Sequence, residues 1–461
     1  MCIVFVFIFL SANITAFSQV PNVPKTVKVP KVSKISKFNK ESHNYIVSTR
    51  NGAKNYFVNN TILSNFSIEY DGKITVSDDD SDIIAISNGG YIEIKKSSFG
   101  RKRRIVIDSE GGKLTKRYYV GWSKKDFYPE GKKWLAEILP EIVRTTAIAV
   151  DTRVERFYKK GGANAVLHEI KRIKSDFVQS KYFKLLLERN LSTKELISLI
   201  KTAGNQLSSD FYLSQVLTKN QQKFLQNDQT ITAYINAAKN IGSDFYITEV
   251  VKKVIKDKKI SDNQLSALLE VSKQVSSDHY LTVILKGIMD NRTLNNQNIE
   301  KVLQISKNVS SDHYKTLILK KVIQSKNISA PAYNSFISTM SDISSNHYLT
   351  EVIKELLKKK LDDNLLKNLL ELIKENISSD HYATLLYKKI AKRSDLTESQ
   401  IINILNNAAD TINSSHYLSQ TLISYSNRVK KGSSKLREVY AKAAKEINSD
   451  TYFGKAMKAI Y

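Results

Sequence analysis

The sequence predicts an α+β protein in which an N-terminal antiparallel β meander or sandwich precedes a right-handed α-solenoid. The solenoid is a HEAT-like superhelix of 34–35-residue repeats. One observation behind this prediction is a short motif that recurs nine times along residues 175–452. The motif is Ser-Asp in seven copies, Ser-Asn in one and Ser-Ser in one, and an aromatic residue follows in most copies. The other is a series of short β-branched and aromatic runs, separated by glycine turns, that fills residues 43–128. Hydrophobic residues make up 41% of the 461 residues, which excludes a disordered chain.

Residues 1–18 have the features of a signal peptide. Ile3–Leu10 form an apolar run that is too short for a membrane span of about 20 residues. Small residues at Ala16 and Ser18 fit the pattern cleaved by signal peptidase. No Lys or Arg precedes the run, so a buried N-terminal strand is the alternative. We expect an exported bacterial protein, periplasmic or extracellular, whose mature chain begins near Gln19.

Residues 19–42 are expected to form an extended linker. Lysine recurs at every third position from Lys25 to Lys40, and three prolines lie in the same stretch. A period of three matches polyproline II geometry and places the ammonium groups along one edge. The segment is either a solvated linker or a tether to an acidic surface, and it is the only part of the mature chain for which we expect peripheral membrane contact.

Within the β-rich module of residues 43–128, glycine turns predict hairpins, because Asn-Gly and Asp-Gly supply the positive φ angles of tight turns. The expected pairs are Phe66–Tyr70 with Lys73–Val76, Ile83–Ser87 with Tyr91–Lys95, and Arg104–Asp108 with Leu114–Val120. The acidic cluster of residues 78–82 could bind calcium, but it lacks the glycine and glutamate of an EF-hand loop. We interpret it as a solvated connection between strands.

The repeats occupy residues 175–461, after a helical entry cap of residues 129–174 that contains a break at Gly161-Gly162. The motif serines are Ser175, Ser209, Ser243, Ser277, Ser311, Ser345, Ser379, Ser414 and Ser449, at intervals of 34 or 35 residues. Each unit reads as two helices. The serine is expected to cap the second of these, and the aspartate to lie on its first turn, where the helix dipole favours negative charge. The structural repeat positions are Ser209, Asp210, Ser243, Asp244, Ser277, Asp278, Ser311, Asp312, Ser379 and Asp380.

Helical hairpins of this period bury their apolar faces only against their neighbours. Leu285, Leu303 and Leu319 are expected to line the continuous core, and small residues such as Gly204 to mark close helix approaches. The first helix of a unit begins with a capping box, as at Ser261-Asp262-Asn263-Gln264. The last copy ends after one helix and is expected to cap the array.

The blocks Gly89–Ile94, Trp134–Pro140 and Gly161–Leu167, leading into Ser-Asp repeats, resemble a bacterial family of extracytoplasmic proteins. In that family a β-module precedes helical repeats, and similar repeat tails occur on membrane metallopeptidase sensors of the antirepressor type. The resemblance implies an architecture and an extracytoplasmic location. It implies no particular activity.

One repeat position carries a row of histidines: His279, His313, His347, His381 and His416. Equivalent residues of stacked hairpins lie roughly 9–10 Å apart, which is too far for two neighbours to share a zinc ion. Phe211 and Phe245 occupy the same position in other units, which favours packing, with pH sensing as the alternative. The tyrosines that follow this position are expected to be inter-repeat core. We expect no catalytic, cofactor-binding or metal-binding residues, and the single Cys2 excludes a disulfide framework.

The formal net charge of +26 predicts an acidic partner. We therefore expect a non-enzymatic, monomeric binding scaffold for an acidic protein or envelope polymer. One alternative is an enzyme with a site at the junction of the β-module and the repeats, where His43, His168, Asp126 and Glu130 are candidates. Another is a basic solenoid that binds nucleic acid, which an exported protein is not expected to meet.

Overall fold

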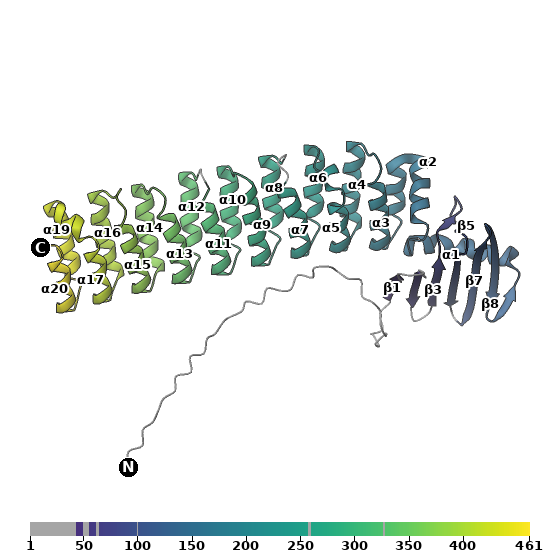
Figure 1. The fold of residues 1–461 in the computed structure, drawn as a ribbon, viewed down its shortest axis with the longest axis horizontal. Coiled ribbons are helices and arrows are strands. Elements are labelled where there is room, and N and C mark those ends of the chain that lie inside the picture. Colours follow the sequence, from purple (N-terminus) through teal and green to yellow (C-terminus); the bar gives the residue numbers. More distant parts are fainter. Residues whose placement is uncertain (1–42, 49–54, 61–63, 99, 257–259, 326–327) are drawn as a thin grey trace, which may run out of the picture. The chain divides into compact units, whose positions relative to one another are not determined.

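The computed structural model describes residues 43–48, 55–60, 64–98, 100–256, 260–325 and 328–461. The predicted signal peptide and the Lys25–Lys40 segment lie outside these residues. The chain divides into two compact units, one of residues up to 72 with 86–131 and the other of residues 73–85 with 132–461 (Figure 1). In the described ranges, no helix has the length and apolar character needed to cross a membrane.

The first unit contains a seven-stranded antiparallel sheet of order β1-β2-β3-β6-β7-β8-β9. The sheet strands are β1 (His43–Ser48), β2 (Asn55–Asn60), β3 (Ser64–Asp71), β6 (Tyr91–Ser98), β7 (Arg101–Glu110), β8 (Lys113–Val120) and β9 (Ser123–Lys125). Alternate residues of the central strands are buried, as Ile92, Ile94, Ile105 and Ile107 show. This alternation is the pattern of a sheet with one apolar face. The unit ends in a short π-helical turn, η1 (Phe127–Gly131).

Strand pairing confirms one predicted hairpin and contradicts two. Arg104 lies opposite Tyr119, so β7 and β8 pair as expected. However, β3 pairs with β2 and β6, where Tyr70 lies opposite Asn55 and Ile92. Strands β4 (Ile74–Val76) and β5 (Ile83–Ile86) form a separate two-stranded sheet. The chain therefore leaves the large sheet after Gly72, whose φ of 86° makes the turn, and rejoins it at β6.

The second unit is an array of helices that begins with α1 (Lys132–Thr145) and α2 (Val150–Ile170). The helices that start with the Ser-Asp motif, here called the Ser-Asp helices, are α3 (Asp176–Leu186), α5 (Asp210–Thr218), α7 (Asp244–Ile255), α9 (Asp278–Asn291), α11 (Asp312–Ile323), α13 (Asn346–Leu356), α15 (Asp380–Ala391), α17 (Ser415–Ile423) and α20 (Asp450–Lys458). The alternating helices are α4 (Thr193–Gln206), α6 (Asp228–Ala238), α8 (Asp262–Ser272), α10 (Asn296–Ser306), α12 (Ala330–Met340), α14 (Asp363–Asn376), α16 (Glu398–Thr411) and α19 (Ser434–Ala444). Short helices η2 (Gln221–Lys223) and α18 (Ser426–Lys431) lie in connections.

From α2 to α15, each helix packs on the helix two places further along the chain, and α16 and α17 pack on α19 and α20, which makes two parallel rows (Figure 1). The Ser-Asp helices form one row and the alternating helices form the other. This arrangement confirms the predicted α+β fold with a solenoid of helical hairpins.

Local sequence explains where these helices begin and break. Ser192, Ser261 and Thr397 each accept a hydrogen bond from the backbone N–H three residues on, in the predicted capping boxes. The backbone of α2 leaves helical geometry at Gly161 and Gly162, and Gly162 has a φ of 62° that side chains rarely adopt.

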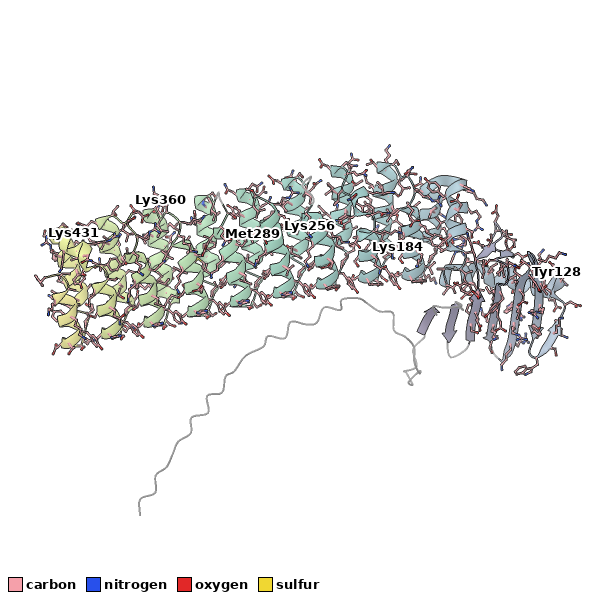
Figure 2. The ribbon with its side chains drawn as sticks, in the orientation of Figure 1. Tyr128, Lys184, Lys256, Met289, Lys360 and Lys431 are labelled. Atoms are coloured by element: carbon pink, nitrogen blue, oxygen red, sulfur yellow. The ribbon has the colours of Figure 1, made fainter. Side chains whose placement is uncertain are left out.

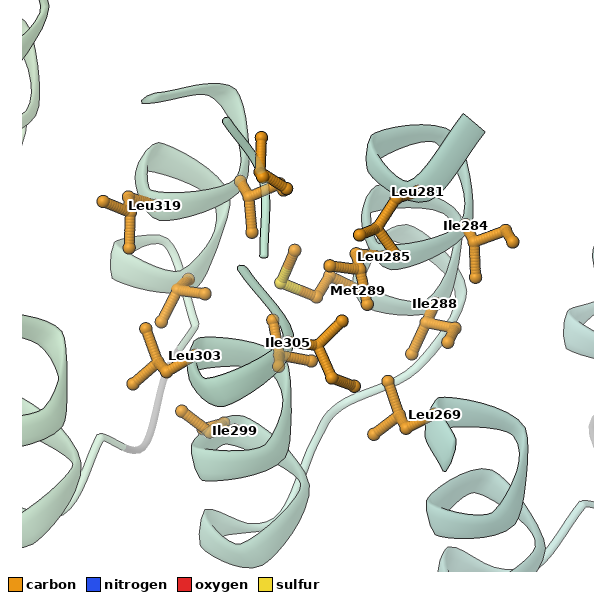
Figure 3. Packing of buried hydrophobic residues seen from close by; sticks show 14 of the residues in the cluster. Leu269, Leu281, Ile284, Leu285, Ile288, Met289, Ile299, Leu303, Ile305 and Leu319 are labelled. Carbon is orange, nitrogen blue, oxygen red and sulfur yellow. The ribbon is translucent and has the colours of Figure 1, made fainter. Parts of the chain in front are cut away.

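The core of the array is continuous from repeat to repeat. Leu285, Leu303 and Leu319 have no exposed surface, as predicted, and Figure 3 labels them among the buried side chains of α9, α10 and α11. At Gly204 a Cβ atom would meet the Cβ of Ala237 at 3.2 Å, so the predicted small position does mark a close helix approach.

Candidate functional site

The Ser-Asp motif connects one repeat to the next. In each copy the serine is the N-cap residue, but from Ser209 onward its side chain forms no capping hydrogen bond. Instead the aspartate accepts a hydrogen bond from the backbone N–H of the next motif serine. This bond joins Asp176 to Ser209, Asp210 to Ser243, Asp244 to Ser277, Asp278 to Ser311, Asp312 to Ser345 and Asp380 to Ser414, at 2.6–2.8 Å.

The motif serines therefore stand at the N-cap, as predicted, but most of them form no side-chain capping bond. The aspartate lies on the first helical turn, as predicted, and also bonds the next repeat. It supplies an acceptor to an N–H group that a helix start leaves without a partner. The strict spacing of the motif was the signal for a link between repeats, although spacing alone does not name the bonded atoms.

Aromatic rings form an unbroken row along the Ser-Asp helices, here called the aromatic row. From Phe211 to His416, each ring two residues after the motif serine lies between the tyrosine of its own repeat and the tyrosine of the next, and Phe177 contacts the tyrosine of the next repeat, Tyr212. The ring centroids of His279 lie 5.2 Å from Tyr280 and 5.9 Å from Tyr314, edge to face. Phe211 has nearly the same geometry, 5.0 Å from Tyr212 and 5.9 Å from Tyr246.

The aromatic row lies at the border between core and solvent. Its tyrosines are half-buried and pack against the core, as the inter-repeat interpretation expects. Its histidines His279, His313, His347, His381 and His416 are all exposed. Histidine and phenylalanine therefore make the same contacts at this position, and the pH-sensing hypothesis stays a prediction. Within the described residues, no group of three or more His, Cys, Asp or Glu side chains could hold a metal ion.

A second row, here called the lysine row, lies on the same side of the Ser-Asp helices. Residues 2, 6, 9 and 13 places after the motif serine share one helix face, since they are three or four positions apart. At the ninth place, seven of the nine copies have lysine: Lys184, Lys252, Lys286, Lys320, Lys354, Lys388 and Lys458. Figure 2 labels one of these, Lys184. The net charge of the sequence predicted a basic surface but not this periodic placement of lysine.

The lysines of the row differ in their surroundings. Lys320 and Lys354 both pair with Glu351, at 2.9 and 3.2 Å. Burial lowers the pKa of Lys184, as do the charges of Lys181 and Lys219. Lys286 is half-buried and has no hydrogen-bond or ionic partner among the described residues.

A surface cleft of about 720 Å³ lies on this face, between α7, α9 and α11. Its apolar lining comes from Ile255, Val283 and Leu317, and Tyr314 and His279 of the aromatic row also line it. Its charged lining residues are Glu249, Lys252, Lys253, Lys256, Lys286 and Asp290.

The charges of the cleft do not cancel. Glu249 pairs with Lys252 at 3.1 Å, and Asp290 pairs with Lys321 at 2.5 Å. Lys253, Lys256 and Lys286 have no such partner in the part of the chain that the structure describes, and Figure 2 labels Lys256. The cleft therefore presents, around apolar walls, three ammonium groups that have no ionic partner among the described residues.

A buried ion cluster near the start of the helical array is a separate feature. Arg153 on α2 is completely buried and donates hydrogen bonds to Asp80 at 2.6 Å and to Glu169 at 2.8 Å. Arg156 also donates to Asp80, at 2.7 Å. Burial alone would raise the pKa of Asp80, but the hydrogen bonds and charges of Arg153 and Arg156 hold that pKa below its ordinary value.

The cluster corrects the interpretation of residues 78–82 as a wholly solvated connection. Asp78 and Asp79 are exposed, whereas Asp80 is 6% exposed and ties this loop to α2. Because each charge in the cluster is paired and buried, we interpret the cluster as structural.

The structure places the four candidate residues of the enzyme alternative on three different elements and in the segment before η1. His43 lies in β1. Asp126 precedes η1, Glu130 lies within η1, and both side chains are exposed. His168 lies on α2 and is exposed. Within the second unit, His168 belongs neither to the cleft nor to the ion cluster.

Comparisons with known proteins add little to this geometry. No protein-family model matches the sequence, and no curated protein matches it. Among solved structures, the chain has a match to a protein described as "Computational Design of Self-Assembling Cyclic Protein Homooligomers". That match covers 70% of this chain and 96% of that chain, at 13% identity and a TM-score of 0.10. A score this low carries no argument about fold or function.

Proposed function

We propose that the chain is a non-enzymatic, extracytoplasmic binding scaffold that holds an acidic protein or envelope polymer on the exposed face of its Ser-Asp helices. The observation that carries this proposal is the lysine row. Lysine recurs at one position of seven repeats, on a helix face that the neighbouring row of helices leaves uncovered. An extended acidic ligand can contact several such lysines at once, and each added contact raises its avidity.

The aromatic row supports the same face as the binding surface. It borders the lysine row along the same helices, so that face offers both charge and half-buried rings. Aromatic side chains supply contact area at low entropic cost, which binding surfaces commonly use. The extracytoplasmic location rests on the signal-peptide features of residues 1–18 and on the family resemblance.

The test is binding of labelled poly-L-glutamate at physiological salt, followed by fluorescence anisotropy. A variant with Lys286, Lys320 and Lys354 replaced by Gln should bind at least about tenfold more weakly, since each lost contact with a charged partner removes a favourable term. The matched control replaces Lys273, Lys307 and Lys367, which lie on or directly after alternating helices. It changes the net charge equally and should bind like the wild type.

Two outcomes would contradict the proposal. Equal losses in both variants would show that net charge attracts the probe and that no particular face binds it. Tighter binding of duplex DNA than of poly-L-glutamate, with a steep fall in affinity as salt rises, would favour the nucleic-acid alternative.

A further inference from the structure

Gly287 is an exception among the residues that stand ten places after the motif serine. Lysine stands at this place in four repeats, as Lys219, Lys253, Lys321 and Lys389, and glutamate stands there as Glu355. Glycine in a helix interior is destabilising, so its presence within α9 needs a reason other than helix formation. A Cβ at Gly287 would have only Ile255 Cδ1 within 4 Å, at 3.8 Å, so no crowding demands glycine here.

The missing side chain opens the cleft between α7, α9 and α11. Gly287 lines that cleft together with Lys286 of its own helix and Lys253 and Lys256 of α7. A side chain as long as that of lysine at position 287 would extend from α9 into the space between α7 and α9. The glycine thus gives this repeat an accessible hollow.

The walls of the cleft show what kind of ligand fits it. Ile255, Val283 and Leu317 are apolar, and the ring of Tyr314 adds an aromatic edge. The hydroxyl of Thr282, which also lines the cleft, has no hydrogen-bond partner within the described residues. A small inorganic anion would leave the apolar walls uncovered, whereas a ligand with an apolar group between anionic groups would contact both walls and lysines.

We propose that this cleft is the specific site for an acidic peptide segment in which an aromatic or aliphatic side chain is flanked by carboxylates. The apolar side chain enters the hollow above Gly287, and the carboxylates pair with Lys253, Lys256 and Lys286. This inference rests on the proposed function, because it assigns a peptide to the binding face. The lysine row attracts the acidic chain, and the cleft selects it.

The experiment uses two labelled peptides of identical charge, each rich in glutamate, one with a central tryptophan and one with serine in its place. The wild-type protein should bind the tryptophan peptide about tenfold more tightly, because burial of an aromatic ring adds a hydrophobic contribution. Gly287→Lys should reduce this affinity to that of the serine peptide, although the variant gains a positive charge.

The control is Ser424→Lys, at the equivalent place after Ser414, which adds the same charge without filling the cleft. It should retain the preference for tryptophan. A second variant, Lys253→Gln with Lys286→Gln, should weaken binding of both peptides about equally. Thermal unfolding followed by circular dichroism should show that Gly287→Lys is folded, because the site has room for the added Cβ.

Three results would overturn the inference. If Gly287→Lys binds the tryptophan peptide as tightly as the wild type does, the cleft is not the site. If both peptides bind the wild type equally and binding depends on the lysine row, the result supports the proposed function but contradicts the cleft as a site for an apolar side chain. If polygalacturonate or inorganic phosphate displaces the tryptophan peptide at lower concentration than unlabelled peptide does, the ligand is not a peptide. Failure of both peptides to bind would contradict the proposed function itself.

Discussion

The carboxylate of Asp278 accepts a hydrogen bond of 2.8 Å from the backbone N–H of Ser311, the first residue of the next Ser-Asp motif. In a capping box the glutamate of the same helix satisfies this N–H. Here the preceding repeat supplies the acceptor. At six of the eight junctions between motif copies, one repeat therefore completes the helix start of its successor, and the motif is a cap that acts between units.

Asp278→Ala should reduce the free energy of unfolding by about 1–3 kcal/mol, because the half-buried N–H of Ser311 loses its acceptor. Asp278→Asn should cost less, because its amide oxygen can still accept a hydrogen bond. Asn346 shows this at the position before the motif serine, where it accepts from the N–H of Ser378 at 3.0 Å, as Asp278 accepts from Ser310. Urea denaturation measures both variants. Faster hydrogen exchange at the Ser311 amide in the alanine variant alone would confirm the local cause, and equal losses in both variants would contradict it.

Leu285→Ala should destabilise the protein by about 2–5 kcal/mol, because Leu285 is fully buried in the inter-repeat core and its loss leaves a cavity. Denaturation followed by circular dichroism measures this change. In a solenoid the damage should stay near the altered repeat, so hydrogen exchange should accelerate in α9 and its neighbours before distant helices. A loss below about 1 kcal/mol would contradict the cavity argument.

His313→Phe should be tolerated, with a stability change within about 1.5 kcal/mol. His313 lies 5.2 Å from Tyr314 and 5.7 Å from Tyr348, close to the distances that Phe211 keeps from its two tyrosines. The same denaturation assay compares it with Leu285→Ala. If the histidine variant is the more damaging one, the aromatic row is more than packing, and the scaffold proposal gives way to a site-based function.

Acid should weaken the buried ion cluster. The pKa of Asp80 is lower in the folded protein than its ordinary value of about 3.9. Asp80 therefore contributes stability at pH values above the unfolded pKa, and this contribution is lost as the pH falls through the folded pKa. The loss begins below about pH 4, so denaturation between pH 5 and pH 2 should show falling stability in the wild type and a flatter profile in Asp80→Asn.

At pH 7, Asp80→Asn should cost about 3–5 kcal/mol, because Arg153 is left buried with one carboxylate fewer. Asp78→Asn is the control in the same loop. Asp78 pairs with Lys160 at 3.1 Å while both side chains remain more than half exposed, so its loss should change stability by less than about 1 kcal/mol. Similar losses in both variants would mean that burial of Asp80 is not the cause.

The fold could be predicted from the sequence where the contacts that determine it recur in every repeat and join neighbouring helices. The 34-residue period and the capping boxes specify helices whose partners are always the next helices along the chain. The prediction failed for Phe66–Tyr70, which was expected to pair with the strand after Asp71-Gly72. A turn signal at Gly72 indicates a turn in the chain, but it does not name the strand's partners, which are β2 and β6.

In the candidate site, too, the features that recur in every repeat were predictable and the contacts between distant residues were not. The aromatic row was predictable because one repeat position carries it, and the lysine row was recoverable from the same register. The ion pair of Asp80 with Arg153 joins residues 73 positions apart, and no local pattern in the sequence marks it. The cleft at Gly287 was not predicted. In the sequence, a single glycine inside a predicted helix indicates only a small loss of helix propensity, and its role is visible once the residues around it in space are known.

Gly287 also breaks the translational symmetry of the binding face. Identical lysines at equal intervals would let a long acidic chain shift by one repeat at no cost in energy, so it would bind in many equivalent registers. The hollow at Gly287 makes those registers unequal. The protein then favours one binding register of its ligand, because the ligand's apolar residue must lie in the hollow. The position of that residue fixes where the rest of the acidic chain lies.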